Sequence, residues 1–154
     1  MRRESVIAFI VGAVLFFGVK SMTPRGIRNN NPGNIMSDGS TVWNGQVGVD
    51  AGGYLVFSTP EYGMRAMAVN LYHYQEWSGL GTIRAIIERW APPSTNDTAA
   101  YIADVSARLG IAPGAAVNVV QILPQLIPAI IWHENGEQPY TAQQIAQAIQ
   151  MAGL

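Results

Sequence analysis

Carboxylates are the side chains of this sequence best suited to carry out a reaction, and Glu134 is the first candidate for a catalytic residue. It follows the apolar residues 130–132 and precedes Asn135 and Gly136, where a helix is expected to end. Apolar neighbours and the negative end of a helix dipole both favour the protonated form of a carboxyl group. Such a group can act as a general acid, as glycosidic cleavage requires. An exposed glutamate in a last helical turn explains the same local pattern equally well.

Glu61 is the second candidate. The run Thr59-Pro60-Glu61 is typical of a helix start, with a capping threonine, a proline in the first turn and an acid beside it. The positive end of the helix dipole lowers the pKa of a carboxyl group in this place, which suits acid catalysis poorly. A structural role for Glu61 is therefore favoured.

A polar segment rich in asparagine occupies residues 25–35. Its four asparagines, two glycines and one proline predict an ordered loop rather than a stable helix or a central strand. Carboxamides donate and accept hydrogen bonds at once, which suits neutral ligands such as glycans. We expect Asn30, Asn31 and Asn34 to contact such a ligand. The alternative is a polar linker.

Aromatic side chains supply stacking faces for sugar rings. Trp43 and Tyr101 stand in polar surroundings and are the better candidates for a binding groove, with Tyr62 as a third. Trp90 falls on the apolar stripe of a predicted helix, where a core position is favoured.

Several classes of function are excluded by what the sequence lacks. It has no cysteine, and its two histidines form no metal-binding motif, so no metal or cofactor is predicted. It contains neither a phosphate-binding loop nor the nucleophile elbow of serine hydrolases. A formal net charge of −1 gives no support for nucleic-acid binding.

The N-terminus predicts a membrane anchor. Residues 5–19 are apolar and are flanked by Arg2, Arg3 and Lys20, with no small-residue cleavage pattern. The alternative is a signal peptide. A chain of 154 residues then divides into an anchor, residues 1–22, and one globular domain, residues 23–154.

The domain is predicted to be mainly helical, with one small hairpin or irregular excursion in residues 36–58. Helices are expected after Thr59, after Thr98, after Thr141 and over residues 82–90. Pro124 and Pro128 interrupt the helical pattern of residues 117–133, which predicts two separate pieces there.

Four separated motifs carry a resemblance to a known family. They are RGIRNNNPGNI (residues 25–35), FSTPEYGMRA (57–66), WAPPSTNDT followed by Tyr101 (90–101) and HENG (133–136). Together they resemble the phage virion-associated peptidoglycan-degrading proteins, of which the lytic protein of the enveloped phage phi6 is one. The likeness covers roughly residues 24–150.

Such proteins are similar to lysozyme-like lytic transglycosylases, in which one glutamate ends a helix in an E-S-x motif. Glu134 matches that glutamate, with Asn135 where serine is usual. The motif lies late in this chain, and one interpretation is a circularly permuted order in which the asparagine-rich loop supplies cleft residues. The resemblance to the phi6 protein also implies endopeptidase activity.

The resemblance implies a membrane-anchored virion enzyme that opens the host cell wall during genome entry. Glu134 would protonate the bond between MurNAc and GlcNAc, then act as base toward the MurNAc 6-hydroxyl or toward water. Its partners would be glycan strands, other virion proteins and the lipid of the virion membrane or the host inner membrane, reached through residues 5–19. The rivals are a peptidoglycan endopeptidase and a non-catalytic structural or wall-binding subunit.

Overall fold

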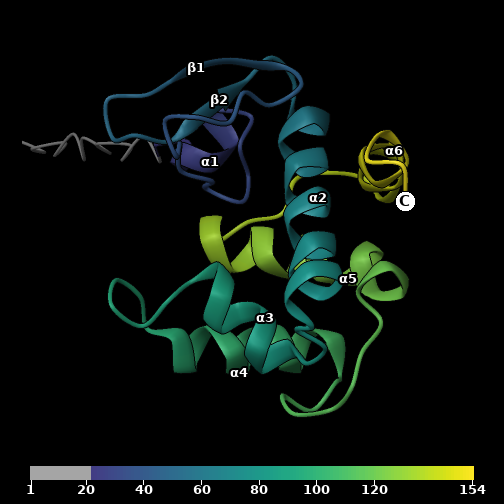
Figure 1. Ribbon diagram of the computed structural model, residues 1–154. Coiled ribbons are helices and arrows are strands. Elements are labelled where there is room, and N and C mark those ends of the chain that lie inside the picture. The colour runs from purple at the N-terminus through teal and green to yellow at the C-terminus, as the bar shows by residue number, and fades with distance from the viewer. Residues whose placement is uncertain (1–21) are drawn as a thin grey trace, which may run out of the picture.

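The computed structural model describes residues 22–154, and within them the prediction of a mainly helical chain with a small β excursion is confirmed (Figure 1). The elements are α1 (Arg25–Arg28), β1 (Gln46–Val49), β2 (Leu55–Phe57), α2 (Pro60–Ser78), α3 (Ile83–Trp90), α4 (Thr98–Leu109), α5 (Val119–Asn135) and α6 (Ala142–Met151).

The proposed anchor, residues 5–19, lies outside the described part. In residues 22–154 we find no helix that combines the length and apolar character needed to cross a bilayer.

Most helix boundaries follow from capping side chains. Asp97 and Thr141 cap α4 and α6, and Thr82 caps α3 by accepting a hydrogen bond from the amide of Ala85. Thr141 and Gln144 form a complete capping box. Thr59 occupies the N-cap position of α2 as predicted, but its side chain makes no capping hydrogen bond.

The prediction of two helical pieces in residues 117–133 is wrong, because α5 runs unbroken through both prolines. Pro124 is exposed and Pro128 is half-buried, so both lie toward the outer side of the helix, one turn apart. Their spacing leaves the buried stripe of α5 continuous, and packing of that stripe outweighs the lost backbone hydrogen bonds.

The asparagine-rich loop also differs from expectation, because its first four residues form the one-turn helix α1. The remaining residues are irregular, as predicted. Asn30 and Asn34 have positive φ angles of 52° and 49°, the left-handed region in which asparagine is enriched.

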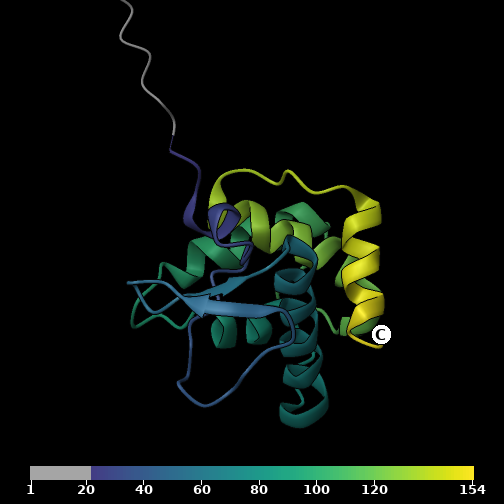
Figure 2. The ribbon, with the colours of Figure 1, turned by 90° about the horizontal axis from the view of Figure 1, so that it is seen from above.

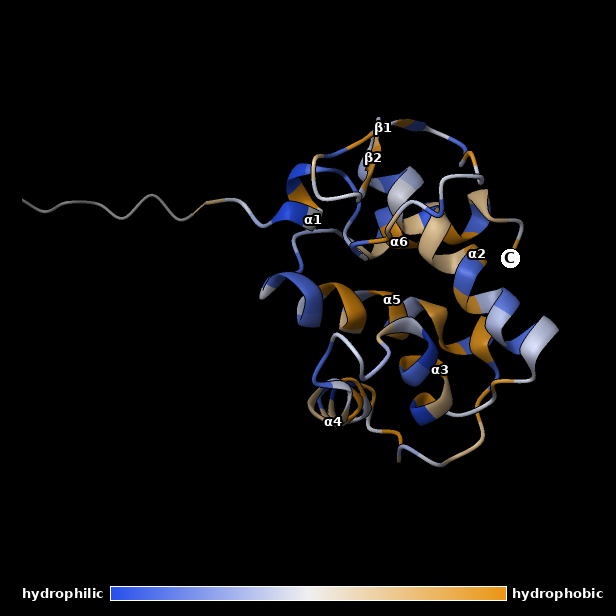
Figure 3. Cartoon of the chain, turned by 60° about the vertical axis from the view of Figure 1, so that its left-hand side comes forward, coloured by the Kyte–Doolittle hydropathy of each residue, from blue (hydrophilic) through white to orange (hydrophobic). Residues whose placement is uncertain are grey.

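Helix α2 forms the centre of the domain. Its residues Met64, Met67 and Leu71 are fully buried and pack with the apolar sides of α3, α4, α5 and α6 in one core. Figure 3 shows apolar segments of α2, α3 and α5 toward the interior. Seen from above, the hairpin and α6 flank α2 on opposite sides (Figure 2).

The hairpin has a small core of its own. Strands β1 and β2 are antiparallel, with an irregularity between Gln46 and Gly48. Leu55, Phe57 and Ala66 form this second cluster and join the hairpin to the first turns of α2. Hydrogen bonds from Asn30 and Asn31 to the carbonyls of Phe57 and Leu55 join the asparagine-rich loop to this hairpin.

Gly63 lets the asparagine-rich loop pass directly over α2. A Cβ atom at this position would overlap the backbone carbonyl of Asn30 and lie 3.0 Å from Cδ of Pro32. The contact partner is backbone, which cannot move aside without shifting the whole loop. A residue without a side chain is therefore required where the loop crosses the helix.

We predict that Gly63→Ala destabilises the protein, although alanine ordinarily stabilises a helix relative to glycine by about 0.5–1 kcal/mol. Overpacking against backbone should cost about 1–3 kcal/mol, measured by thermal or urea unfolding. Gly114→Ala is the control, because a Cβ there meets no atom within 4 Å. Equal stability of both variants would contradict the proposed packing of the loop.

Candidate functional site

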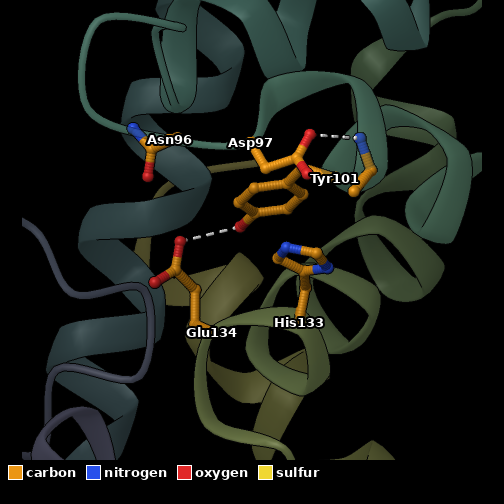
Figure 4. A pocket seen from close by; sticks show the side chains of 6 residues that line it. Asn96, Asp97, Tyr101, His133 and Glu134 are labelled. Atoms are coloured by element: carbon orange, nitrogen blue, oxygen red, sulfur yellow. Dashed lines mark hydrogen bonds between the residues drawn. The ribbon is translucent and has the colours of Figure 1, made fainter.

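Glu134, in the last turn of α5, is held by two hydrogen bonds from separate parts of the chain. Nδ2 of Asn34 donates to its Oε2 at 2.9 Å. The hydroxyl of Tyr101 donates to its Oε1 at 2.8 Å, a hydrogen bond that Figure 4 shows. Asn34 comes from the asparagine-rich loop and Tyr101 from α4. The two hydrogen bonds together fix the rotamer of the Glu134 side chain.

Asn135 fastens the end of α5 to the same loop. Its Nδ2 donates to the carbonyl of Pro32 at 2.8 Å and to the carbonyl of Ile131 at 2.9 Å. The loop and the carboxylate are thus connected twice, once through Asn34 and once through the residue that follows Glu134.

Gly26 of α1 leaves room for the carboxamides of Asn34 and Asn135. A Cβ atom there would lie 3.1 Å from Oδ1 of Asn34 and would overlap Oδ1 of Asn135. Both oxygens are buried, accept no hydrogen bond from residues 22–154 and occupy the space that a side chain at Gly26 would fill. The amide nitrogen of Asn34 points the other way and donates to Glu134.

Tyr101 remains a hydrogen-bond donor over the whole physiological range. Its side chain is almost fully buried, and burial together with the nearby Glu134 carboxylate raises the pKa of its phenol far above the usual value. The proton of this hydrogen bond therefore stays on the tyrosine.

A second group of polar side chains packs against the ring of Tyr101. The ring of His133 stacks on that of Tyr101, with centroids 3.7 Å apart and an interplanar angle of 21°. Nδ1 of His133 is 2.9 Å from Oδ2 of Asp104, whose Oδ1 accepts a hydrogen bond from Nε of Arg108 at 2.9 Å. Partial burial alone would raise the pKa of Asp104, but the hydrogen bonds from His133 and Arg108 lower it.

An open depression of about 230 Å³ joins these groups to solvent. It is lined by Asn96, Asp97, Ala100, Tyr101, His133 and Glu134. Asp97 is partly used in capping α4, because its Oδ1 accepts from the amide of Ala100. The depression accordingly offers carboxyl, imidazole and carboxamide groups at one place.

Of the predicted ligand-binding residues, the structure brings Asn34 and Tyr101 to Glu134. Asn30 and Asn31 instead bond to the hairpin. Nδ2 of Asn30 donates to the carbonyl of Phe57, while fully buried Asn31 bonds to Ile35 and to the carbonyl of Leu55. The partly buried rings of Trp43 and Tyr62 pack against the small hairpin core.

Glu61 is placed outside this depression and connects two helices. Its Oε1 accepts a hydrogen bond from Nε2 of Gln144 on α6 at 3.0 Å. Partial burial would raise the pKa of Glu61, but the bonds from its own amide, Gln144 and Thr59 lower it, as the sequence predicted.

Sequence reasoning missed His133 and Asp104 as members of the site. A signal was present, because His133 precedes Glu134 and because Asp104 and Arg108 have the i, i+4 spacing of a helical ion pair. Only the packing of α4 against α5 shows that these signals belong together.

Residues 22–154 contain no group of three or more histidine, cysteine, aspartate or glutamate side chains suited to a metal ion.

Comparison with known proteins places this helical domain among bacteriophage proteins. No model of a known protein family matches the sequence. The chain is 38% identical over 146 residues to protein P5 of Pseudoalteromonas phage PM2, an alignment that covers 93% of this chain and 91% of that protein. The chain therefore belongs to the family of phage PM2 protein P5. This finding supports the predicted phage origin, while the likeness to the phi6 protein stays a prediction.

We predict that Asn31→Ala and Asn34→Gly affect stability very differently. Loss of the Asn31 side chain leaves buried partners on Ile35 and Leu55 unsatisfied and should cost about 2–4 kcal/mol of unfolding free energy. Asn34→Gly keeps the left-handed backbone and removes a half-buried bond, so its loss should be below about 1.5 kcal/mol. Chemical denaturation checks this order, and a larger loss for Asn34→Gly would contradict the assigned roles.

Proposed function

We propose that this protein is a virion-associated peptidoglycan-cleaving enzyme of the lysozyme-like, lytic transglycosylase or muramidase type. The observation that carries the proposal is the Glu134 carboxyl group, which borders an open depression and is oriented by donors from two distant segments. A carboxyl group fixed beside an opening to solvent is what general acid catalysis of glycosidic cleavage needs.

The geometry leaves Glu134 free to transfer a proton. Each of its oxygens accepts one hydrogen bond, from Asn34 and from Tyr101, and keeps a second lone-pair position. When protonated, the group would donate to the glycosidic oxygen without giving up its orientation.

The lining of the depression favours glycosidic over peptide bond cleavage. The described residues around it include no serine, threonine or cysteine that would serve as a nucleophile on an amide. The endopeptidase remains the rival, and the bond that is cut distinguishes the two. Cleavage of sugar chains leaves new reducing or anhydro ends, whereas cleavage of peptides leaves new amines.

Membership of a phage protein family supports a place in the virion. We further propose that residues 5–19 hold the domain on a lipid membrane, because they are apolar and flanked by basic residues. The enzyme would then act on the cell wall from the virion membrane or from the host inner membrane during genome entry.

The membrane proposal predicts a clear difference between two forms of the protein. The full chain should float with liposomes in a density gradient, and the chain without residues 1–22 should remain in the soluble fraction with unchanged helical circular dichroism. Flotation of the truncated form would show that another surface binds lipid and would contradict the assignment.

We predict that Glu134→Gln lowers the rate of murein cleavage by about 10²–10⁴-fold, because the amide keeps the shape of the side chain but has no proton to transfer. The rate is measured on purified murein by mass spectrometry of the released muropeptides. Unfolding of the variant should follow that of the wild type within about 1 kcal/mol, so that the loss is attributable to chemistry.

Glu61→Gln is the matched control, with the same chemical change outside the depression. It should retain most of the cleavage activity and lose some stability, because Glu61 bonds to α6. Since its folded-state pKa is lowered from 4.5, this contribution is present above about pH 4.5 and is lost as the pH falls through the lower folded-state pKa. Abolished cleavage in folded Glu61→Gln, with normal cleavage by Glu134→Gln, would refute the assignment.

A further inference from the structure

His133 and Asp104 form a second proton-transfer unit that the proposed acid does not use. Nδ1 of His133 lies 2.9 Å from Oδ2 of Asp104. A carboxylate at Nδ1 holds a neutral imidazole in the tautomer that carries its proton there, which leaves Nε2 as an acceptor. Nε2 makes no hydrogen bond to any part of the chain between residues 22 and 154.

The orientation of this imidazole is fixed from two sides. Its ring stacks on Tyr101, and Asp104 is in turn held by Arg108 at 2.9 Å, while the Arg108 guanidinium lies over the ring of Trp132 at 4.9 Å.

His133 and Glu134 lie at different parts of the Tyr101 side chain. Glu134 accepts a hydrogen bond from the tyrosine hydroxyl, whereas His133 packs on the face of the ring, so the two groups contact different parts of the same side chain (Figure 4). Both line the same depression. An inverting glycosidase likewise uses two groups that line one site, a general acid for the leaving oxygen and a general base for the attacking water.

We propose that His133, oriented by Asp104, is the general base that activates water in this site, and that cleavage is hydrolytic. The inference rests on the proposed function. Nε2 of His133 would take a proton from water while the water oxygen forms a bond to the anomeric carbon. The bond from that carbon to the glycosidic oxygen breaks, and the leaving oxygen takes the proton of Glu134. Solvent then removes the proton from His133 and returns one to Glu134.

The role of His133 as base determines which of two products forms, a reducing sugar end or an anhydro sugar end. A base on His133 gives a reducing sugar end that contains one added water. If Glu134 itself served as base toward the MurNAc 6-hydroxyl, the product would be an anhydro sugar lighter by one water. Mass spectrometry separates these products directly.

The test compares muropeptides released from purified murein by the full chain and by three variants. The wild type should release reducing ends. His133→Gln should lose at least about 10²-fold in the rate of their release. His133→Phe keeps an aromatic ring on Tyr101 and should be equally impaired, whereas Asp104→Asn should show a smaller loss because it disturbs only the tautomer.

Three results would overturn the inference. These are anhydro ends from the wild type, normal release of reducing ends by His133→Gln, and restored release in His133→Phe, which would show that the ring only packs. If a variant fails to fold, as judged by its thermal unfolding, His133→Ala with added imidazole replaces it, and rescue of hydrolysis is then expected. If Glu134→Gln loses cleavage while the His133 variants keep it, the proposed function stands and the role of His133 as base is rejected. If the wild type releases no sugar ends at all, both the proposed function and the role of His133 are rejected.

Discussion

The hydrogen bond between Asn34 and Glu134 joins residues one hundred positions apart and is the interaction on which the site depends. It requires the asparagine-rich loop to lie at the end of α5, and several features serve that placement. Gly63 lets the loop cross α2, Gly26 admits the two carboxamide oxygens, and Asn135 ties the helix end to Pro32. Each of these contacts is specific to one residue type.

The rest of the domain serves as a support for this junction. The loop is held by hydrogen bonds to the hairpin, and the hairpin is held by its small core on α2. Helix α5 is held by the large core, which also fixes α4 and therefore Tyr101. Because Asn34 and Tyr101 both hydrogen-bond to Glu134, its side chain loses little conformational entropy when a substrate binds. A fixed orientation of this kind favours proton transfer.

Much of the fold follows from local signals in the sequence. Thr82 and Thr141 mark helix starts through ordinary capping, and Gly110 and Gly136 mark helix ends. The continuity of α5 could not be predicted in the same way, because Pro124 and Pro128 are strong local breakers. Their effect is overcome only by the packing of the buried side of the helix, which is a tertiary property.

The site shows the same division between local and tertiary information. Glu134 could be selected from its position at the end of an apolar helix. Asn31 and Asn34 could not be distinguished, since they are identical in type and three positions apart, yet one supports the hairpin and the other contacts the carboxylate. His133 and Asp104 lie on different helices, and their pairing exists only once α4 packs on α5.

The most direct test of the central claim is a crystal structure of the inactive Glu134→Gln variant with a bound glycan fragment of alternating GlcNAc and MurNAc. We expect one glycosidic oxygen to lie within about 3.2 Å of the carboxamide of residue 134, with the sugar chain crossing the depression between α4 and α5. A glycan bound elsewhere on the domain, with residue 134 beyond hydrogen-bonding reach of every glycosidic oxygen, would contradict it.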